Sequence, residues 1–132
     1  MEIRTETIVF LENKPGTLAR VAKALGEKGV NVEGFMIHES VDHGVVRMVT
    51  SDAGKAAHVL GEGGLLTIEA EVLCVPLSNR PGALADLAQR LASAKVNVDY
   101  AYGTVGPAGK EATLVLRVGN ARKALAALGG PA

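Results

Sequence analysis

Two short asparagine-containing segments occur twice in this sequence, and their residues are well suited to binding a small polar molecule. Asn13-Lys14-Pro15-Gly16 recurs as Asn79-Arg80-Pro81-Gly82, and Val30-Asn31-Val32 recurs as Val96-Asn97-Val98. An asparagine amide offers both a donor and an acceptor, and the backbone N–H groups at a helix start attract an anion. Gly16 lacks a Cβ, so a ligand can approach the backbone closely. These groups suit a molecule that carries a carboxylate and an ammonium group.

The spacing of the two motifs indicates an internal duplication of the whole chain. Both motifs recur at the same offset of 66 residues, which is half of the 132-residue length. A repeat of this kind is the strongest single signal of architecture that a sequence can carry. The elements that position the motifs are therefore expected twice.

Each copy is predicted to contain strands and helices in the order β-α-β-β-α-β, which is the split βαβ pattern of a ferredoxin-like sandwich. Apolar residues alternate or cluster in the expected strands, and Leu18, Val21, Ala22 and Leu25 follow the i, i+3, i+4, i+7 spacing of a helix. Gly29 suits the left-handed position after that helix, and Asp52 and Asn120 suit helix N-caps. The predicted strands are 7–11, 30–39, 45–50, 65–76 (with 72–77 opening the second copy), 96–104 and 112–118. The first helix carries residues 18–25 and has Pro15 in its first turn, and the other helices are 53–60, 82–94 and 121–128. Turns are expected at 41–44 and 106–109.

The second copy lacks a final strand, because only Gly129-Gly130-Pro131-Ala132 follows its last helix. A ferredoxin-like sheet without its fourth strand would leave an edge uncovered. By the 66-residue offset, residues 1–6 are expected to complete the second sheet while running on into the first strand. Two long strands, about 1–12 and 66–78, would then each serve both copies. The expected domains are 1–70 and 71–132, with residues 1–6 completing the second.

The order strand, Asn-x-Pro-Gly loop, helix and Val-Asn-Val strand resembles the ACT domain, a family of small βαββαβ regulatory modules that bind amino acids. The resemblance covers nearly the whole chain as two tandem copies. It implies an α+β fold of two ferredoxin-like ACT domains, with antiparallel sheets, helices on one face and a pseudo-twofold pairing. It also implies a regulatory protein that senses a free amino acid between the two domains. A cytoplasmic location is expected separately, because charged residues interrupt the N-terminal segment where a signal peptide would be apolar.

The resemblance also implies which residues hold the ligand. In serine-binding members, the loop asparagine of one domain works with the asparagine that opens the second strand of the other, so Asn13 would pair with Asn97 and Asn79 with Asn31. Those members carry a histidine two residues before the loop asparagine, where Leu11 and Leu77 stand here, which favours a ligand with an apolar side chain. The implied ligand-binding residues are Asn13, Gly16, Thr17, Leu18, Asn31, Val32, Asn79, Gly82, Ala83, Leu84, Asn97 and Val98.

Simpler interpretations of the same residues remain open. The Pro-Gly loops could be structural turns, and Asn31 and Asn97 could merely begin strands. His38, Glu39, Asp42 and His43 could suggest a metal, but they flank an expected turn where polar residues are common. The glycine-rich segment 103–110 departs from a phosphate-binding loop, because Lys110 is followed by Glu111 rather than Ser or Thr. The alternative function is an assembly module without a ligand, for example a regulatory subunit of an amino-acid biosynthetic enzyme.

The composition narrows the classes of function further. The 14 Lys and Arg residues balance 14 Asp and Glu, and there are only two Phe, two Tyr and no Trp, which argues against nucleic-acid binding. No apolar run suggests a membrane span, and the single Cys74, expected to be buried and inert, excludes an internal disulfide. No catalytic constellation, metal site or cofactor motif can be placed. The expected partners are a free amino acid and either a metabolic enzyme or further copies of the chain.

Overall fold

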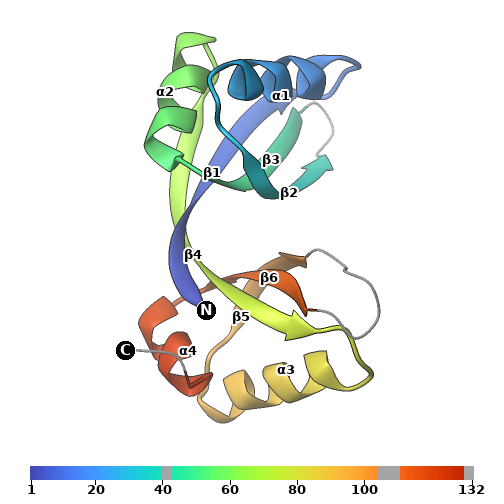
Figure 1. Ribbon diagram of the computed structural model, residues 1–132, viewed down its shortest axis with the longest axis vertical. Coiled ribbons are helices and arrows are strands. Elements are labelled where there is room, and N and C mark those ends of the chain that lie inside the picture. Colours follow the sequence, from blue (N-terminus) through green and yellow to red (C-terminus); the bar gives the residue numbers. More distant parts are fainter. Residues whose placement is uncertain (40–42, 104–110, 130–132) are drawn as a thin grey trace. The chain divides into compact units, whose positions relative to one another are not determined.

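The chain folds into two compact units that each contain one copy of the repeat (Figure 1). The computed structural model describes residues 1–39, 43–103 and 111–129. The first-copy unit comprises Thr5–Ala70, and the second-copy unit comprises Met1–Arg4 together with Glu71–Ala132. The expected turn at 106–109 lies outside the described residues, as do residues 41 and 42 of the turn at 41–44. His43 and Gly44, predicted in that turn, instead belong to the strand that pairs with Glu12 and Leu11.

The elements follow the predicted order in both copies. The first copy contains β1 (Glu2–Glu12), α1 (Thr17–Glu27), β2 (Val32–Glu39), β3 (His43–Thr50) and α2 (Ala53–Glu62). The second contains β4 (Thr67–Ser78), α3 (Ala83–Ser93), β5 (Val98–Gly103), β6 (Glu111–Val118) and α4 (Ala121–Ala127). The predicted fold class, α+β with two ferredoxin-like units, is confirmed.

Each unit pairs strands that are distant in sequence. The strand order is β2-β3-β1 in the first-copy unit and β4-β6-β5 in the second-copy unit. In the first-copy unit, β3 pairs antiparallel with both β1 and β2; in the second-copy unit, β6 pairs antiparallel with both β4 and β5. The register shifts at the same place in both copies, between Val32 and Gly34 and between Val98 and Tyr100.

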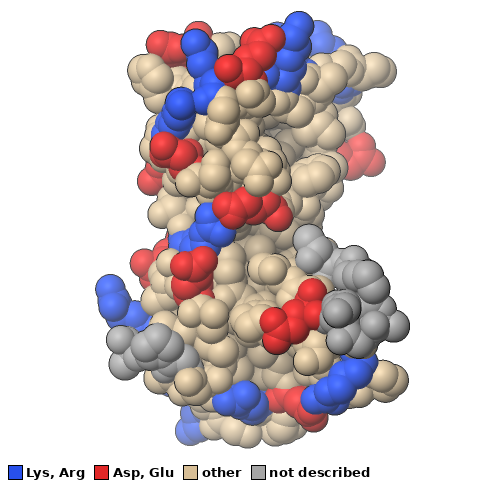
Figure 2. Space-filling view, viewed as in Figure 1, with Lys and Arg blue, Asp and Glu red and all other residues tan. Residues whose placement is uncertain are grey.

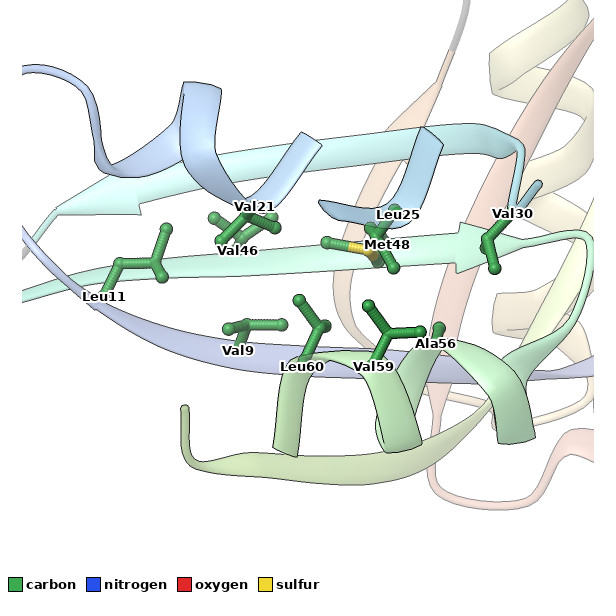
Figure 3. Packing of buried hydrophobic residues seen from close by; sticks show 10 residues of the cluster. All are labelled: Val9, Leu11, Val21, Leu25, Val30, Val46, Met48, Ala56, Val59 and Leu60. Carbon is green, nitrogen blue, oxygen red and sulfur yellow. The ribbon is translucent and has the colours of Figure 1, made fainter. Parts of the chain in front are cut away.

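The core of the first-copy unit lies between its sheet and its two helices. Figure 3 shows Val9 and Val46 on the strands pointing toward Val21 and Leu25 on α1 and Leu60 on α2. All five side chains are buried, with Val9, Leu25 and Val46 fully so. Burial of a Val or Leu side chain contributes about 1.5–3 kcal/mol, so this cluster fixes α1 and the loop that precedes it.

The second-copy unit repeats this packing with its own residues. Leu73 and Val75 on β4 and Leu116 on β6 form a buried cluster with Leu87 and Leu91 on α3. Further members of the cluster come from α4. Ile3, near the start of β1, packs against the same cluster. Helix α3 is therefore held on the second sheet as α1 is held on the first.

The residues predicted to cap or end helices take these positions in the structure. The side chains of Asp52 and Asn120 accept hydrogen bonds from the N–H groups of Lys55 and Lys123, both at 3.0 Å. Gly29 follows α1 with φ of +73°, in the left-handed region, and Lys95 takes the equivalent place after α3 with φ of +59°.

Cys74 is buried, as expected, and carries no disulfide. In the described part of the chain, no helix is both long and apolar enough to cross a membrane.

Candidate functional site

The loop between β4 and α3 borders a hollow of about 210 Å³ in the second-copy unit. It combines apolar side chains with the polar residues of the second Asn-x-Pro-Gly motif. The volume is below the about 300–1,000 Å³ of clefts that hold drug-sized ligands, which suits a smaller molecule. The lining residues are Leu77, Ser78, Asn79, Arg80, Ala83, Leu84 and Ala112.

Gly82 shapes this loop so that the start of α3 faces the hollow. It is the N-cap residue, its φ of +86° lies in the left-handed region, and it offers no side-chain cap. The N–H of Ala83 donates to the Arg80 carbonyl at 3.3 Å, and that of Asp86 to the Gly82 carbonyl at 2.9 Å. The N–H groups of Leu84 and Ala85 fall in the first helical turn, where no intrahelical acceptor exists. They are positioned to attract a negatively charged group.

Arg80 supplies a positive charge to the same loop. Its guanidinium donates to the Asp86 carboxylate at 3.0 Å and to the Pro81 carbonyl at 3.2 Å. A guanidinium has five N–H donors in a planar fork, so these two contacts orient the group without using all of its donors. Asn79, beside it, is half-buried and also makes a contact of its own.

The equivalent loop of the first copy is bonded internally. Gly16 has φ of +90° and caps α1 without a side-chain bond, as Gly82 does for α3. The hydroxyl of Thr17 lies 3.0 Å from the carbonyl oxygens of both Glu12 and Lys14, to which it can donate. The Asn13 side-chain N–H donates to the Glu39 carboxylate at 2.6 Å.

An exposed ion pair also links two residues of this first loop. The Lys14 ammonium lies 2.8 Å from the Glu12 carboxylate. The hydrogen bond from Lys14 and the charge of its ammonium lower the pKa of the Glu12 carboxyl below its ordinary value of 4.5. In the second copy Ser78 and Ala83 replace Glu12 and Thr17, so neither this carboxylate nor this hydroxyl is present there.

The two asparagines of the second motif immediately precede the strands β2 and β5. The backbone of Asn31 makes two hydrogen bonds with Ser51. The Asn31 N–H donates to the Ser51 hydroxyl at 2.9 Å, and the Asn31 carbonyl accepts from the Ser51 N–H at 2.9 Å. Asn97 donates its side-chain amide to the Asp99 carboxylate at 3.1 Å. Asn31 precedes β2 and Asn13 contacts its last residue, so about 26 Å of extended chain separates Asn31 from the Asn13 contact within one copy.

The residues implied by the resemblance thus fall into different environments. Asn79, Ala83 and Leu84 come together around the second-copy hollow, and Gly82 adjoins them. Leu18 and Val32 instead line an apolar hollow of about 160 Å³ between α1 and the sheet of the first-copy unit. Gly16, Asn31, Asn97 and Val98 are exposed, and Thr17 is half-buried.

Two residues beyond that set take part in these loops. Arg80 lies inside the repeated motif, where both copies carry a basic residue, so the repeat itself held the signal. The sequence suggested Glu39 only as a possible metal ligand. No local pattern predicts that it is the partner of Asn13, because the two residues meet only through the pairing of distant strands.

The arrangement of the charged side chains bears on the metal and nucleic-acid interpretations. Among residues 1–39, 43–103 and 111–129, no group of three or more His, Cys, Asp or Glu side chains is placed to hold a metal ion. Of the four residues considered, Asp42 lies outside those ranges. Figure 2 shows acidic and basic side chains interspersed on the face drawn, without a large patch of one sign.

Comparison with known proteins places the chain in a family. The sequence profile of the ACT domain pair matches residues 1–128, so the chain belongs to this family. Among solved structures, protein BT0572 from Bacteroides thetaiotaomicron is similar at 29% identity and a TM-score of 0.89, over 96% of this chain and 87% of that one. No curated protein matches the sequence.

Two further solved structures share the fold. The regulatory subunit of aspartate kinase from Thermus thermophilus, in its ligand-free form, is 17% identical with a TM-score of 0.72, over 98% of this chain and 96% of that one. The corresponding subunit from Thermus flavus is 21% identical with a TM-score of 0.63, over 97% and 92% of the two chains.

Proposed function

We propose that this ACT domain pair is a regulatory protein that senses a free amino acid, with the loop between β4 and α3 as its principal binding site. The observation that carries the proposal is the hollow beside that loop, which combines a helix N-terminus, Arg80 and Asn79 with an apolar wall. A free amino acid has the three matching parts: a carboxylate, an ammonium group and a side chain.

Each part of an amino acid has a complementary group in this hollow. The carboxylate suits the N–H groups at the start of α3 and the Arg80 guanidinium, since both stabilise negative charge. The ammonium group suits the carbonyl oxygen of the Asn79 amide. An apolar side chain suits Leu77, Leu84 and Ala112. This distribution supports an amino acid with a small or medium apolar side chain.

The family supports a regulatory rather than a catalytic role. Two structures of the same fold come from regulatory subunits of aspartate kinase, an enzyme that acts on an amino acid. Because their sequence identity to this chain is low, these structures support the assignment of the fold but not of the ligand. By analogy, we propose that an enzyme of amino-acid metabolism is the regulated partner, and that ligand binding alters the contact with it.

Isothermal titration calorimetry of the whole chain against each of the twenty common amino acids tests the proposal. We expect one or a few apolar amino acids to bind with a dissociation constant in the roughly micromolar to millimolar range, because so small a ligand makes few contacts. Asn79→Ala should weaken binding by about tenfold, as expected when a polar contact to a charged group is lost. Gln89→Ala, on the exposed surface of α3, is the matched control and should bind as the native chain does.

A second candidate function is an assembly module that binds protein rather than a small molecule. It is favoured by Phe35 and Ile37, which are 53% and 48% exposed on β2, the outer strand of the first-copy sheet. Large apolar side chains on an edge strand favour contact with another chain. Absence of binding to every amino acid, together with capture of a partner that Phe35→Lys abolishes, would favour this function instead.

A further inference from the structure

We propose that Ala112 is the residue that selects the ligand by size, because it leaves room in the second-copy hollow for an aliphatic side chain. The inference deepens the proposed function and rests on it. Ala112 lies directly opposite Leu77 in the pairing of β4 with β6, and residues opposite each other in an antiparallel pair project to the same face of the sheet. Leu77 packs against the second-copy core, so this is the face that the helices cover. Both residues line the hollow.

A row of side chains on β6 shows why the space lies at Ala112. Alternate residues of a strand share a face, so Ala112, Leu114, Leu116 and Val118 all project toward the helices. Leu116 and Val118 belong to the second-copy core, and Leu114 packs against it. Alanine has three side-chain carbons fewer than leucine. The row of large apolar side chains therefore stops where the hollow begins.

The position of α3 does not depend on Ala112. Leu87 and Leu91 of α3 are buried in the second-copy core, and Ala83 at the start of the helix is only 6% exposed. A close-packed core of this kind holds the helix at a fixed distance from the sheet. The space beside Ala112 therefore persists in the folded chain, because α3 is held away from it by its other contacts.

An aliphatic side chain of a ligand would complete the apolar surface around this space. Leu84, in the first turn of α3, is 59% exposed although its side chain is large and apolar, and it lines the hollow with Leu77. Carbons placed on Ala112 would lie between these two leucines and remove them from water. Each carbon buried in this way should tighten binding by about fourfold. A larger residue at position 112 would occupy the same space itself.

Calorimetry of the whole chain with alanine, valine and leucine tests this role through a ratio of affinities. The native chain should bind leucine at least tenfold more tightly than alanine, with valine between them. In Ala112→Leu the affinities for leucine and alanine should agree within about twofold, whereas alanine itself should bind within about threefold of its native affinity. Ala112→Val should give an intermediate ratio. Thr113→Leu adds bulk to the next residue of β6, which is exposed and projects to the other face, so it should keep the native ratio.

Thermal unfolding of the same chains without ligand examines the space itself. Ala112→Val and Ala112→Leu should unfold at or above the native temperature, because the added carbons enter the hollow. A clear lowering in both variants would show that the space is too small, and would overturn the inference.

Three binding results would overturn the inference and leave the proposed function standing. They are equal binding of alanine and leucine by the native chain, a native preference for leucine that survives in Ala112→Leu, and binding confined to amino acids without an aliphatic side chain. If none of the twenty amino acids binds the native chain, the proposed function and this inference fall together.

Discussion

Thr7 brings a hydroxyl into the core of the first copy where the second copy has an apolar side chain. It is fully buried on β1, on the same side of the strand as Val9 and Leu11, and its hydroxyl has no hydrogen-bond partner among the described residues. The 66-residue offset places Leu73 opposite it, and Leu73 belongs to the second core. An unsatisfied buried hydroxyl costs free energy, because it gives up its bonds to water.

Thr7→Val should therefore raise the free energy of unfolding by about 1 kcal/mol, since the change keeps the shape and removes the unpaired group. Urea denaturation measures this directly. Thr5→Val, at an exposed position of the same strand, controls for strand propensity and should change stability by less than about 0.5 kcal/mol. A clear loss of stability in Thr7→Val would mean that the hydroxyl makes a bond essential to the core.

The titration of the Glu12 carboxyl reports its ion pair with Lys14. Because Lys14 lowers the pKa of this carboxyl, its titration followed by NMR should have a midpoint below 4.5 at low salt. Lys14→Met and high salt should each move the midpoint upward. The folded-state pKa is the lower one, so any stability gained from the pair exists above the unfolded pKa and is lost as the pH falls through the folded pKa. A midpoint unaffected by Lys14→Met would contradict the pairing.

At the scale of elements, the two copies use different residues at the left-handed position that follows the first helix of each copy. Gly29 and Lys95 both adopt left-handed backbone after α1 and α3, with φ of +73° and +59°. Glycine adopts this conformation without strain, whereas a residue with a Cβ pays roughly 1 kcal/mol. The second copy therefore carries local strain that the first does not.

Lys95→Gly should stabilise the chain by about 0.5–1 kcal/mol, and the reciprocal Gly29→Lys should destabilise it by a similar amount. Differential scanning calorimetry can compare both variants with the native chain. Lys28→Gly, one residue before the left-handed position of the first copy, has φ of −96° and serves as the control; it should bring no gain. A loss of stability in Lys95→Gly would show that the lysine side chain contributes more than the strained backbone costs.

Elements were far more predictable from the sequence than the contacts of the loops. Periodicity placed α1, and the caps at Asp52 and Asn120 form as expected, because each depends on residues close in sequence. The bond from Asn13 to Glu39 depends instead on β1, β3 and β2 lying side by side, which brings together residues 26 positions apart. Local sequence patterns do not reveal such a pairing, so the sequence does not predict Glu39 as a partner of the loop.

At the scale of the whole molecule, we propose that the two copies share their long strands. β1 extends from Glu2 to Glu12 and β4 from Thr67 to Ser78, close to the lengths expected from the 66-residue offset. Residues Met1–Arg4 group with the second copy, although Thr5 and the residues after it belong to the first. We propose that this sharing makes each unit depend on a segment that precedes or follows it in the chain.

Deletion of residues 1–4 should destabilise the second copy more than the first, because it removes Ile3 from the second core and shortens the strand beside β4. Amide hydrogen exchange should show loss of protection concentrated in residues 71–129. Ile3→Ala should reproduce part of the effect, whereas Glu2→Ala, at an exposed position, should not. Loss of protection confined to residues 5–70 would reject the sharing of strands.

Calorimetric titration of the native chain and of Asn79→Ala with each of the twenty amino acids tests the central claim most directly. The account predicts that the native chain binds at least one apolar amino acid below about 10 mM and that Asn79→Ala binds it about tenfold more weakly, with both chains equally stable to heat. Failure of every amino acid to bind at that concentration, or equal binding by the two chains, would contradict the claim that the loop between β4 and α3 senses an amino acid.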